Sequence, residues 1–281
     1  LTQARENYTR ENVLRQLGVH ASFGVTTATS LGADLDAILT AREDIDAGNV
    51  PSAARVLTAL RGFTSKGGYP SREPGFSELV HELHSARDAQ RRVDSLAGAG
   101  ANLIHIWMDH RDESVAGLTP KIYRAIIHRA TKHGLPVSAQ APKLDDAKRL
   151  VKAGVDILVQ SITDRDVDSE FIDLLIANNV TYAPALVSEV ATFEYGDRAP
   201  WLYDNFFKRS IGSGIAPFLN GEELMRQALD PDRSRRIHQR DQAGRNLKTL
   251  ANAGVRIGMA TGSGLAGRFE GYFEHREAEM L

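Results

Sequence analysis

Short apolar runs alternate along the chain with amphipathic segments, and most amphipathic segments end at a glycine or asparagine. Continuous apolar runs of this kind are typical of strands that are buried on both faces of a sheet. The amphipathic segment that begins at Thr119-Pro120 and ends at Gly134 carries both a start and a stop signal for a helix. We predict strands at residues 25–29, 55–59, 103–107, 137–141, 155–159, 180–187 and 256–260.

This alternation predicts an α/β fold with parallel strands and right-handed crossovers, and the length of the repeat suits a TIM-type (β/α)8 barrel. A doubly wound open sheet is the alternative. However, the loop after the first strand, Ser30-Leu31-Gly32-Ala33-Asp34, lacks the glycine pattern that cradles a dinucleotide. Seven strands are apparent in the sequence, so we expect an incomplete barrel.

The stretch 188–240 interrupts the alternation with aromatic residues, glycines and prolines. We expect it to be an insertion or lid within a single barrel domain that spans residues 1–281. Aromatic residues such as Trp201 and Phe207 would either roof an apolar pocket or form a satellite core.

Composition and charge narrow the choice of partners. The 34 basic and 36 acidic side chains are mixed along the chain, which gives no electrostatic reason to bind nucleic acid. No apolar run is long enough to span a bilayer. The absence of cysteine excludes disulfides, thiolate metal sites and cysteine nucleophiles, and it is compatible with the cytoplasmic location that we expect. A small-molecule ligand is the partner that remains.

Several segments together resemble the amidohydrolase superfamily, especially its imidazolonepropionase-like and prolidase-like metal-dependent hydrolases. The similarity rests on the order and spacing of Gly24-Val25-Thr26-Thr27 and of the segments 118–137, 145–156, 253–261 and 268–277. It implies a hydrolase that acts on C–N or C–O bonds of a small organic substrate at the C-terminal mouth of a barrel. It also implies one or two divalent metals, such as zinc, that lower the pKa of a bound water.

The positions that the resemblance assigns to metal ligands are substituted in this chain. A lysine position is occupied by His105, two histidine positions by Gln140 and Gln160, and an aspartate position by Gly262. A glutamine amide is a poor zinc ligand, and glycine has no side chain to coordinate a metal. We therefore predict no metal site and no cofactor, and we doubt the metal-hydroxide mechanism.

The side chains that line the expected mouth are the candidate site. We predict catalytic roles for His105, Gln140, Gln160 and Ser263, since a neutral histidine can act as general acid or base. We predict substrate-binding roles for Trp107, Arg268, Tyr272 and His275. The pair Asp109-His110 after the third strand is an acid–base candidate, although a solvated loop is the more ordinary interpretation.

Two other functions stay open. One is a metal-free or designed catalyst of lyase, isomerase or aldolase type, with Lys66 or Lys143 as its candidate nucleophile. The other is a non-catalytic binding protein. The family's first strand, which carries an H-x-H pair, has no counterpart in the sequence, so we expect a second chain or further segments to complete the barrel. A homo-oligomer is one such arrangement.

Overall fold

The computed structural model describes residues 8–109, 115–211, 231–265 and 267–281. Six parallel strands form one sheet in the spatial order β4–β3–β5–β6–β7–β8. The strands are β3 (Phe63–Ser65), β4 (His81–Leu83), β5 (Ile104–Trp107), β6 (Val137–Gln140), β7 (Ile157–Val159) and β8 (Thr181–Ala183). Two further strands, β1 (Thr27–Ser30) and β2 (Arg55–Thr58), pair in parallel as a separate sheet.

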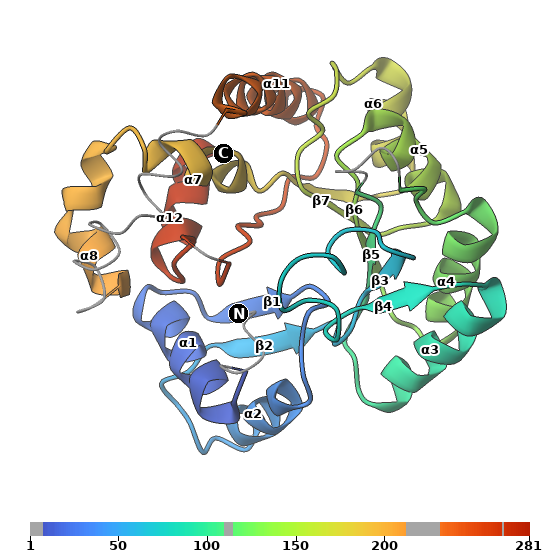
Figure 1. Ribbon diagram of the computed structural model, residues 1–281, viewed down its shortest axis with the longest axis horizontal. Coiled ribbons are helices and arrows are strands. Elements are labelled where there is room, and N and C mark those ends of the chain that lie inside the picture. Colours follow the sequence, from blue (N-terminus) through green and yellow to red (C-terminus); the bar gives the residue numbers. More distant parts are fainter. Residues whose placement is uncertain (1–7, 110–114, 212–230, 266) are drawn as a thin grey trace.

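Helices cover the outer side of this sheet. In Figure 1, α3 (Ala86–Gly98), α4 (Pro120–Lys132), α5 (Leu144–Ala153) and α6 (Ser169–Ala177) lie along it, while α1 (Arg10–Ser22) and α2 (Ala37–Asp46) accompany β1 and β2. Outward-facing side chains such as Ile104 and Ile106 are buried in the main hydrophobic core, which continues under these helices. This is an α/β fold of incomplete TIM-barrel type, as the sequence predicted.

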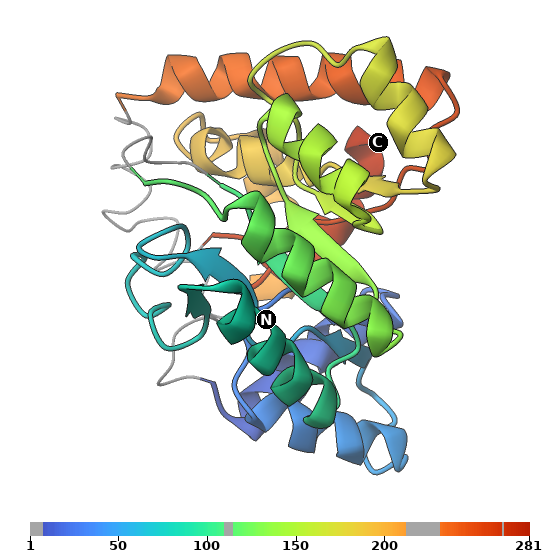
Figure 2. The same cartoon turned by 90° about the vertical axis from the view of Figure 1, so that its right-hand side faces the viewer.

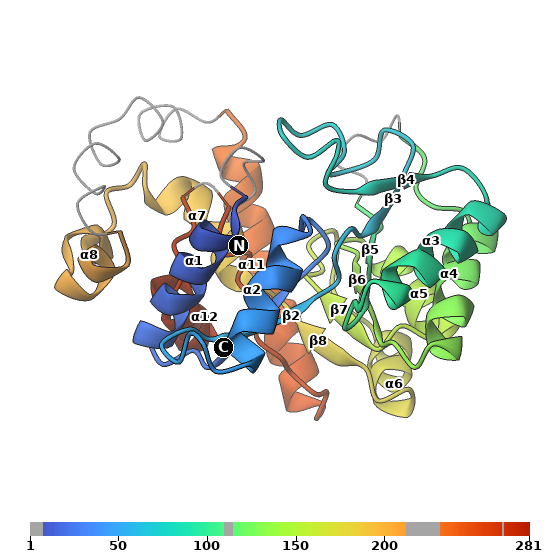
Figure 3. The ribbon, with the colours of Figure 1, turned by 90° about the horizontal axis from the view of Figure 1, so that it is seen from below.

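The remaining helices belong to the C-terminal part of the chain. They are α7 (Leu186–Glu194), the short 3-10 helix η2 (Pro200–Tyr203), α8 (Asn205–Ile211), α11 (Arg233–Asn252) and α12 (Tyr272–Met280). Figure 2 shows α11 as one long straight helix along an edge of the molecule, and Figure 3 shows α7 and α8 on the side opposite α3, α4 and α5. In the described part of the chain, no helix is both long enough and apolar enough to cross a membrane.

The predicted strand at 180–187 was too long. Pairing ends at Ala183, because Pro184 has no backbone N–H and Ala185 adopts a left-handed conformation with φ of 54°. Helix α7 then begins at Leu186.

The predicted strand at 256–260 is reduced to one parallel bridge, between Ile257 and Tyr182 of β8. Two short strands, β3 and β4, were missed because a three-residue strand carries too little pattern to be recognised. Before this segment, helix α11 begins at Arg233, and its first turns are rich in polar side chains that carry no apolar periodicity.

The stretch expected to be an insertion contains α7, η2, α8 and the start of α11, and its residues 212–230 lie outside the described ones. Its aromatic residues form a satellite core, which was one of the two sequence-based alternatives. Trp201 stacks on Tyr272 with ring centroids 5.4 Å apart and meets Phe207 edge-on at 4.8 Å. Its role as a lid stays a prediction.

Candidate functional site

Gln140 and Gln160 lie at one edge of the sheet, where parallel strands end. Gln140 is the last residue of β6 and pairs in register with Val159, the last residue of β7, so Gln160 follows one residue later. Gly262 comes after the bridge that Ile257 makes beside β8, and it therefore lies beyond the same edge. In parallel α/β folds this carboxyl edge is where ligand-binding side chains gather.

Gln140 is fixed against the end of β5. Its side-chain Nε2 donates to Oδ2 of Asp109 at 2.9 Å, and its backbone oxygen accepts a hydrogen bond from the N–H of Met108 at 2.8 Å. Both side chains are half-buried, so a carboxylate and an amide reach the mouth together. The acid–base partner considered for Asp109 was His110, which lies outside the described residues.

His105 lies deeper, in the middle of β5. It is 1% exposed, and its Nδ1 lies 2.8 Å from Oγ of Ser138 on β6. Burial lowers the pKa of His105 to about 3, so the ring is neutral at ordinary pH. This is the environment of a packed core histidine, and its catalytic role stays a prediction.

Trp107 fills space on the inner face above His105. The two rings meet edge-on with centroids 4.7 Å apart. A Cβ added at Gly62 would lie 2.6 Å from the indole, and one added at Gly32 would lie 2.8 Å from it, so these glycines are required for its approach. The indole packs in a small cluster with Leu79 and other apolar side chains, and its contact with substrate stays a prediction.

Gln160 is held by its backbone. Its N–H donates to the carbonyl of Ala183 at 2.9 Å, and its φ of 72° is left-handed. Non-glycine residues rarely adopt this conformation, and where they do it is often associated with function. The side chain is half-buried and follows directly on β7.

Ser263 belongs to a hydrogen-bonded group of its own. Its hydroxyl donates to Oε1 of Glu274, and Oγ1 of Thr261 donates to the same oxygen at 2.9 Å. The other oxygen of Glu274 accepts from the N–H of Gly271 at 2.6 Å. Ser263 is therefore fixed from α12, and its catalytic role stays a prediction.

Arg268 occupies space beside Gly262. Its Nη1 donates to Oγ of Ser188 at 3.1 Å, and a Cβ added at Gly262 would lie only 2.8 Å from the same Nη1. Ser188, on the first turn of α7, donates in turn to the carbonyl of Thr261 at 2.9 Å. A guanidinium therefore lies where a side chain on residue 262 would extend.

The other two predicted substrate contacts lie in packed surroundings. Tyr272 is 7% exposed within the aromatic satellite core, where burial raises its pKa to about 12. Nε2 of His275 lies 2.7 Å from the carbonyl of Phe23 at the end of α1. Their substrate-binding roles stay predictions.

The described residues do not fit the metal centre that the resemblance implies. The amide of Gln140 is bonded to Asp109, the ring of His105 is buried against Ser138, and a cation occupies the space beside Gly262. Within residues 8–109, 115–211, 231–265 and 267–281, no three His, Asp or Glu side chains converge as metal ligands would. The two glutamine amides and the guanidinium, which lie at or beside the implied ligand positions, are unsuited to zinc.

Sequence reasoning missed a row of buried acids near the C-terminus. Glu270, Glu274 and Glu277 are 8%, 7% and 0% exposed. Their spacing of four and three residues puts them on one side of α12 and the turn before it. Acidic residues at helical spacing normally indicate the solvent-exposed face of a helix. The spacing of these three acids therefore suggested exposure, whereas the structure buries them.

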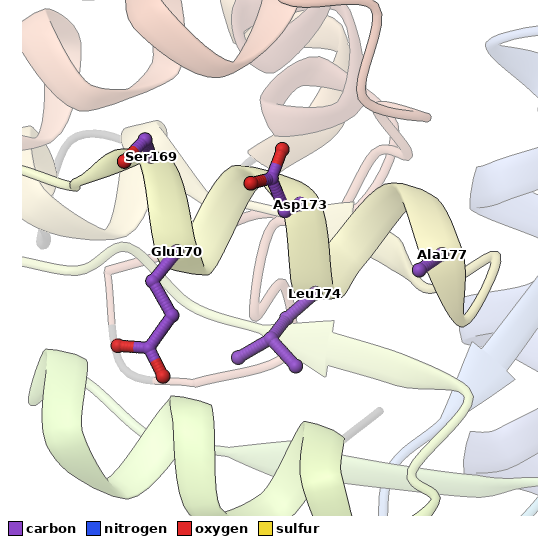
Figure 4. Close-up of a pocket in the computed structure, with 5 residues that line it drawn as sticks. All are labelled: Ser169, Glu170, Asp173, Leu174 and Ala177. Atoms are coloured by element: carbon purple, nitrogen blue, oxygen red, sulfur yellow. The ribbon is translucent and has the colours of Figure 1, made fainter.

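A surface pocket is lined by residues of α6. Figure 4 shows its lining residues Ser169, Glu170, Asp173, Leu174 and Ala177. Glu170 points toward α5, where it pairs with Lys148 at 2.7 Å. This open pocket contains none of the predicted site residues.

Comparison with known proteins identifies the fold. The sequence matches no protein-family model and no curated protein. The structure is similar to a putative prolidase from Bifidobacterium longum, with a TM-score of 0.71 and 20% identity over 98% of this chain and 61% of that one. It is similar to a Xaa-Pro dipeptidase with bound methionine, with a TM-score of 0.69 and 20% identity over 96% of this chain and 63% of that one. It is also similar to A. niger ochratoxinase, with a TM-score of 0.61 and 15% identity over 90% of this chain and 55% of that one. The chain therefore shares the fold of these proteins and spans less than two thirds of the length of each of them.

Proposed function

We propose that this chain forms most of the barrel of a hydrolase that cleaves a C–N or C–O bond of a small organic substrate without a metal hydroxide. The observation that carries the proposal is the contact between Gln140 and Asp109 at the carboxyl edge of β5 and β6. It combines a proton acceptor with an amide at the edge where this fold binds substrates. The similarity of the fold to a Xaa-Pro dipeptidase and to a putative prolidase supports an amide substrate.

The proposed chemistry uses this chain's own side chains. Asp109 accepts a proton from a water molecule, whose oxygen attacks the substrate carbonyl carbon. The side-chain amide of Gln140 holds the Asp109 carboxylate in place, and the side-chain amide of Gln160 donates an N–H to the oxyanion that develops. Asp109 then passes the proton to the leaving nitrogen or oxygen as its bond to carbon breaks, which yields a carboxylic acid and an amine or alcohol.

The test is hydrolysis of a substrate panel after the protein has been treated with EDTA and 1,10-phenanthroline. Xaa-Pro dipeptides and N-acyl amino acids are the probes, and released amine is the readout. We expect turnover to survive chelation and to fall by about 100-fold in Asp109→Asn, the range typical of a lost general base. Asp173→Asn, in the α6 pocket, is the matched control and should retain activity. Turnover that disappears on chelation, or that persists in Asp109→Asn, would overturn the proposal.

A second candidate is a non-catalytic binding protein. It is favoured by the internal contacts of His105 and Ser263, whose polar atoms are bonded to Ser138 and Glu274. Absence of turnover on the whole panel, together with saturable binding of a panel member, would support it. For the aldolase-type alternative, Lys66 is exposed whereas a Schiff-base lysine is normally desolvated, and Lys143 is half-buried.

We also propose a homo-oligomer. Among the described residues, β1 pairs with β2 along one of its edges, and no strand pairs with its other edge. An unpaired strand edge favours association with a strand of another chain. Light scattering after size-exclusion chromatography should give a multiple of 30.8 kDa. A stable monomer at high concentration would argue against it.

A further inference from the structure

We propose that Asn246 of α11 is a positioning residue for the site, because it fixes the loop that sets Gln160 and Gln140 relative to each other. The inference rests on the proposed function, in which both glutamines act at the carboxyl edge of the sheet. Asn246 bonds to the backbone of residues 162–167, so it acts on the reaction through this loop.

The side chain of Asn246 is buried and uses all of its donors and acceptors. It is 1% exposed. Its Nδ2 donates to the carbonyls of Ile162 and Arg165, both at 2.9 Å, and its Oδ1 accepts from the N–H of Val167 at 3.0 Å. Nε2 of Gln242, one turn earlier on α11, donates to the same Oδ1 at 3.2 Å. Removal of this amide would leave buried backbone groups of the loop without partners.

The loop that Asn246 holds follows directly on Gln160. Gln160 has a left-handed φ of 72°, and a residue other than glycine keeps such a conformation only where its surroundings enforce it. Its N–H is bonded to the carbonyl of Ala183, and the N–H of Ile162 donates to the hydroxyl oxygen of Tyr182 at 2.9 Å. These two contacts tie the segment to β8, and the bonds from Asn246 tie it to α11. The segment is therefore fixed from two elements, which keeps the backbone of Gln160 in its strained conformation.

The same loop is tied to the segment that follows β6. The N–H of Thr163 donates to the carbonyl of Pro142 at 3.1 Å. Oδ1 of Asp164 accepts from the N–H of Leu144, the first residue of α5, at 3.0 Å. A displacement of the loop would therefore move the end of β6 together with the end of β7. In the proposed chemistry these strand ends carry the amide that holds the catalytic carboxylate and the amide that binds the oxyanion, so the loop sets their relative position.

The first test is kinetic and uses Asn246→Asp, which keeps the size of the side chain and an acceptor oxygen but loses both N–H donors to the loop. We expect kcat for the best substrate of the panel to fall by about 10- to 100-fold while KM changes by less than about twofold, since a misplaced catalytic group weakens transition-state binding more than substrate binding. Asn252→Ala, at an exposed asparagine of the same helix, is the matched control and should keep the wild-type kcat. An unchanged kcat in Asn246→Asp would overturn the inference.

A double-mutant cycle separates positioning from a general loss of structure. If Asn246 acts through Gln160, the fall in kcat caused by Asn246→Asp should be at least about threefold smaller in the Gln160→Ala background than in the wild type. A merely structural role would give the same fold-loss in both backgrounds, and that result would also overturn the inference.

A third measurement does not depend on turnover. The side-chain amide signals of Gln160 and Gln140 are followed by NMR in the full chain and assigned by their loss in Gln160→Ala and Gln140→Ala. Both signals should shift in Asn246→Asp and stay in place in Asn252→Ala, and unmoved signals in Asn246→Asp would refute the positioning role whatever the activity. Shifted signals in a protein that turns over none of the substrates would support the positioning of both glutamines and overturn the proposed function alone.

Asp164→Ala is the second variant, in case Asn246→Asp does not fold. It removes the bond to the N–H of Leu144 and leaves α11 intact. It should lower kcat and shift the signal of Gln140 more than that of Gln160, because it releases the loop from α5 alone. If kcat and both signals stayed as in the wild type, the loop would not set the position of the site.

Discussion

The two sides of this barrel are held together in different ways. From β5 to β8, neighbouring strands pair in register along their length, and α3 to α6 pack apolar side chains on the outer face. Between α1 and the C-terminal segment, the contacts are between side chains. Gln16 donates to Glu270 at 2.6 Å, Nδ1 of His20 lies 3.7 Å from Glu274, and His275 meets the carbonyl of Phe23.

This difference separates a part of the molecule that is stabilised by backbone ladders from one that is stabilised by buried polar groups. We call them the ladder region, from β5 to β8 with α3 to α6, and the closure region, α1 with residues 261–281. Apolar packing tolerates changes of pH, whereas buried acids and histidines do not. The ladder region should therefore dominate stability, and the closure region should make stability depend on pH and on fine geometry.

The largest effect should come from the core of the ladder region. Phe171 on α6 is fully buried, and Phe171→Ala should lower the free energy of unfolding by about 3–5 kcal/mol. Ile176 on the same helix is 50% exposed, so Ile176→Ala should cost less than about 1 kcal/mol. Urea unfolding followed by circular dichroism measures both. Equal losses would show that α6 does not pack as described.

A backbone substitution should disturb the closure region next. A Cβ on Gly271 would lie 2.4 Å from the ring of Phe23, and the φ of Gly271 is 85°. Gly271→Ala should therefore lower the free energy of unfolding by about 2–4 kcal/mol, from overpacking and strain together. In Gly254→Ala the φ is similar, at 80°, but nothing lies within 4 Å, so it should cost only about 1–2 kcal/mol. The same urea titration distinguishes the two variants. Equal urea midpoints for both would show that a Cβ on residue 271 does not meet the ring of Phe23.

The pH dependence should come from Glu277. Its carboxylate accepts the N–H groups of Leu186 and Val187 at 3.0 and 2.7 Å, but burial outweighs these bonds and raises its pKa from 4.5 to about 7. The folded state then binds this proton more tightly than the unfolded state. The contribution of Glu277 to stability is therefore present below pH 4.5 and is lost as pH rises through about 7.

The measurement compares the wild type with Glu277→Gln between pH 4.5 and 8. The wild type should lose on the order of 2 kcal/mol relative to the variant as pH rises through this window. Burial lowers the pKa of His20, which destabilises the fold as pH falls below 6.5, so only the difference between variants isolates Glu277. Glu279→Gln, at a side chain 69% exposed, is the control and should leave the profile parallel to the wild type. If the stability of Glu277→Gln also ran parallel to that of the wild type across this pH range, the pH dependence would not come from Glu277.

The smallest effect should come from the surface of the ladder region. Lys152 pairs with Glu170 at 2.6 Å, and both side chains are about half exposed. Lys152→Ala should change the free energy of unfolding by less than about 0.5 kcal/mol, since such pairs are screened by solvent. A loss above about 1 kcal/mol would show that the pair is a structural contact.

The sequence predicted the ladder region well, because its apolar runs and capped helices report directly on burial. Thr119-Pro120 begins α4 and Gly154 ends α5 in a left-handed conformation, as local rules require. The closure region could not be predicted, since its contacts join residues more than 250 positions apart, such as Gln16 and Glu270. Polar side chains that become buried only through such pairing resemble surface residues in the sequence.

The candidate site was predicted in part. The positions of Gln140 and Gln160 follow from where their strands end, so the sequence was sufficient for them. The partner of each side chain was not predictable, because Asp109, Ser188 and Glu274 approach from other elements. The closeness of Arg268 to Gly262 depends on a local turn that no periodicity reveals.

The most direct test of the central claim, a metal-independent site, is elemental analysis of the protein purified without chelator, combined with the hydrolysis assay. The account predicts well under one equivalent of zinc, nickel, iron or manganese, and turnover that does not follow the metal content of the preparation. A stoichiometric metal whose removal abolishes turnover, and whose return restores it, would contradict the account.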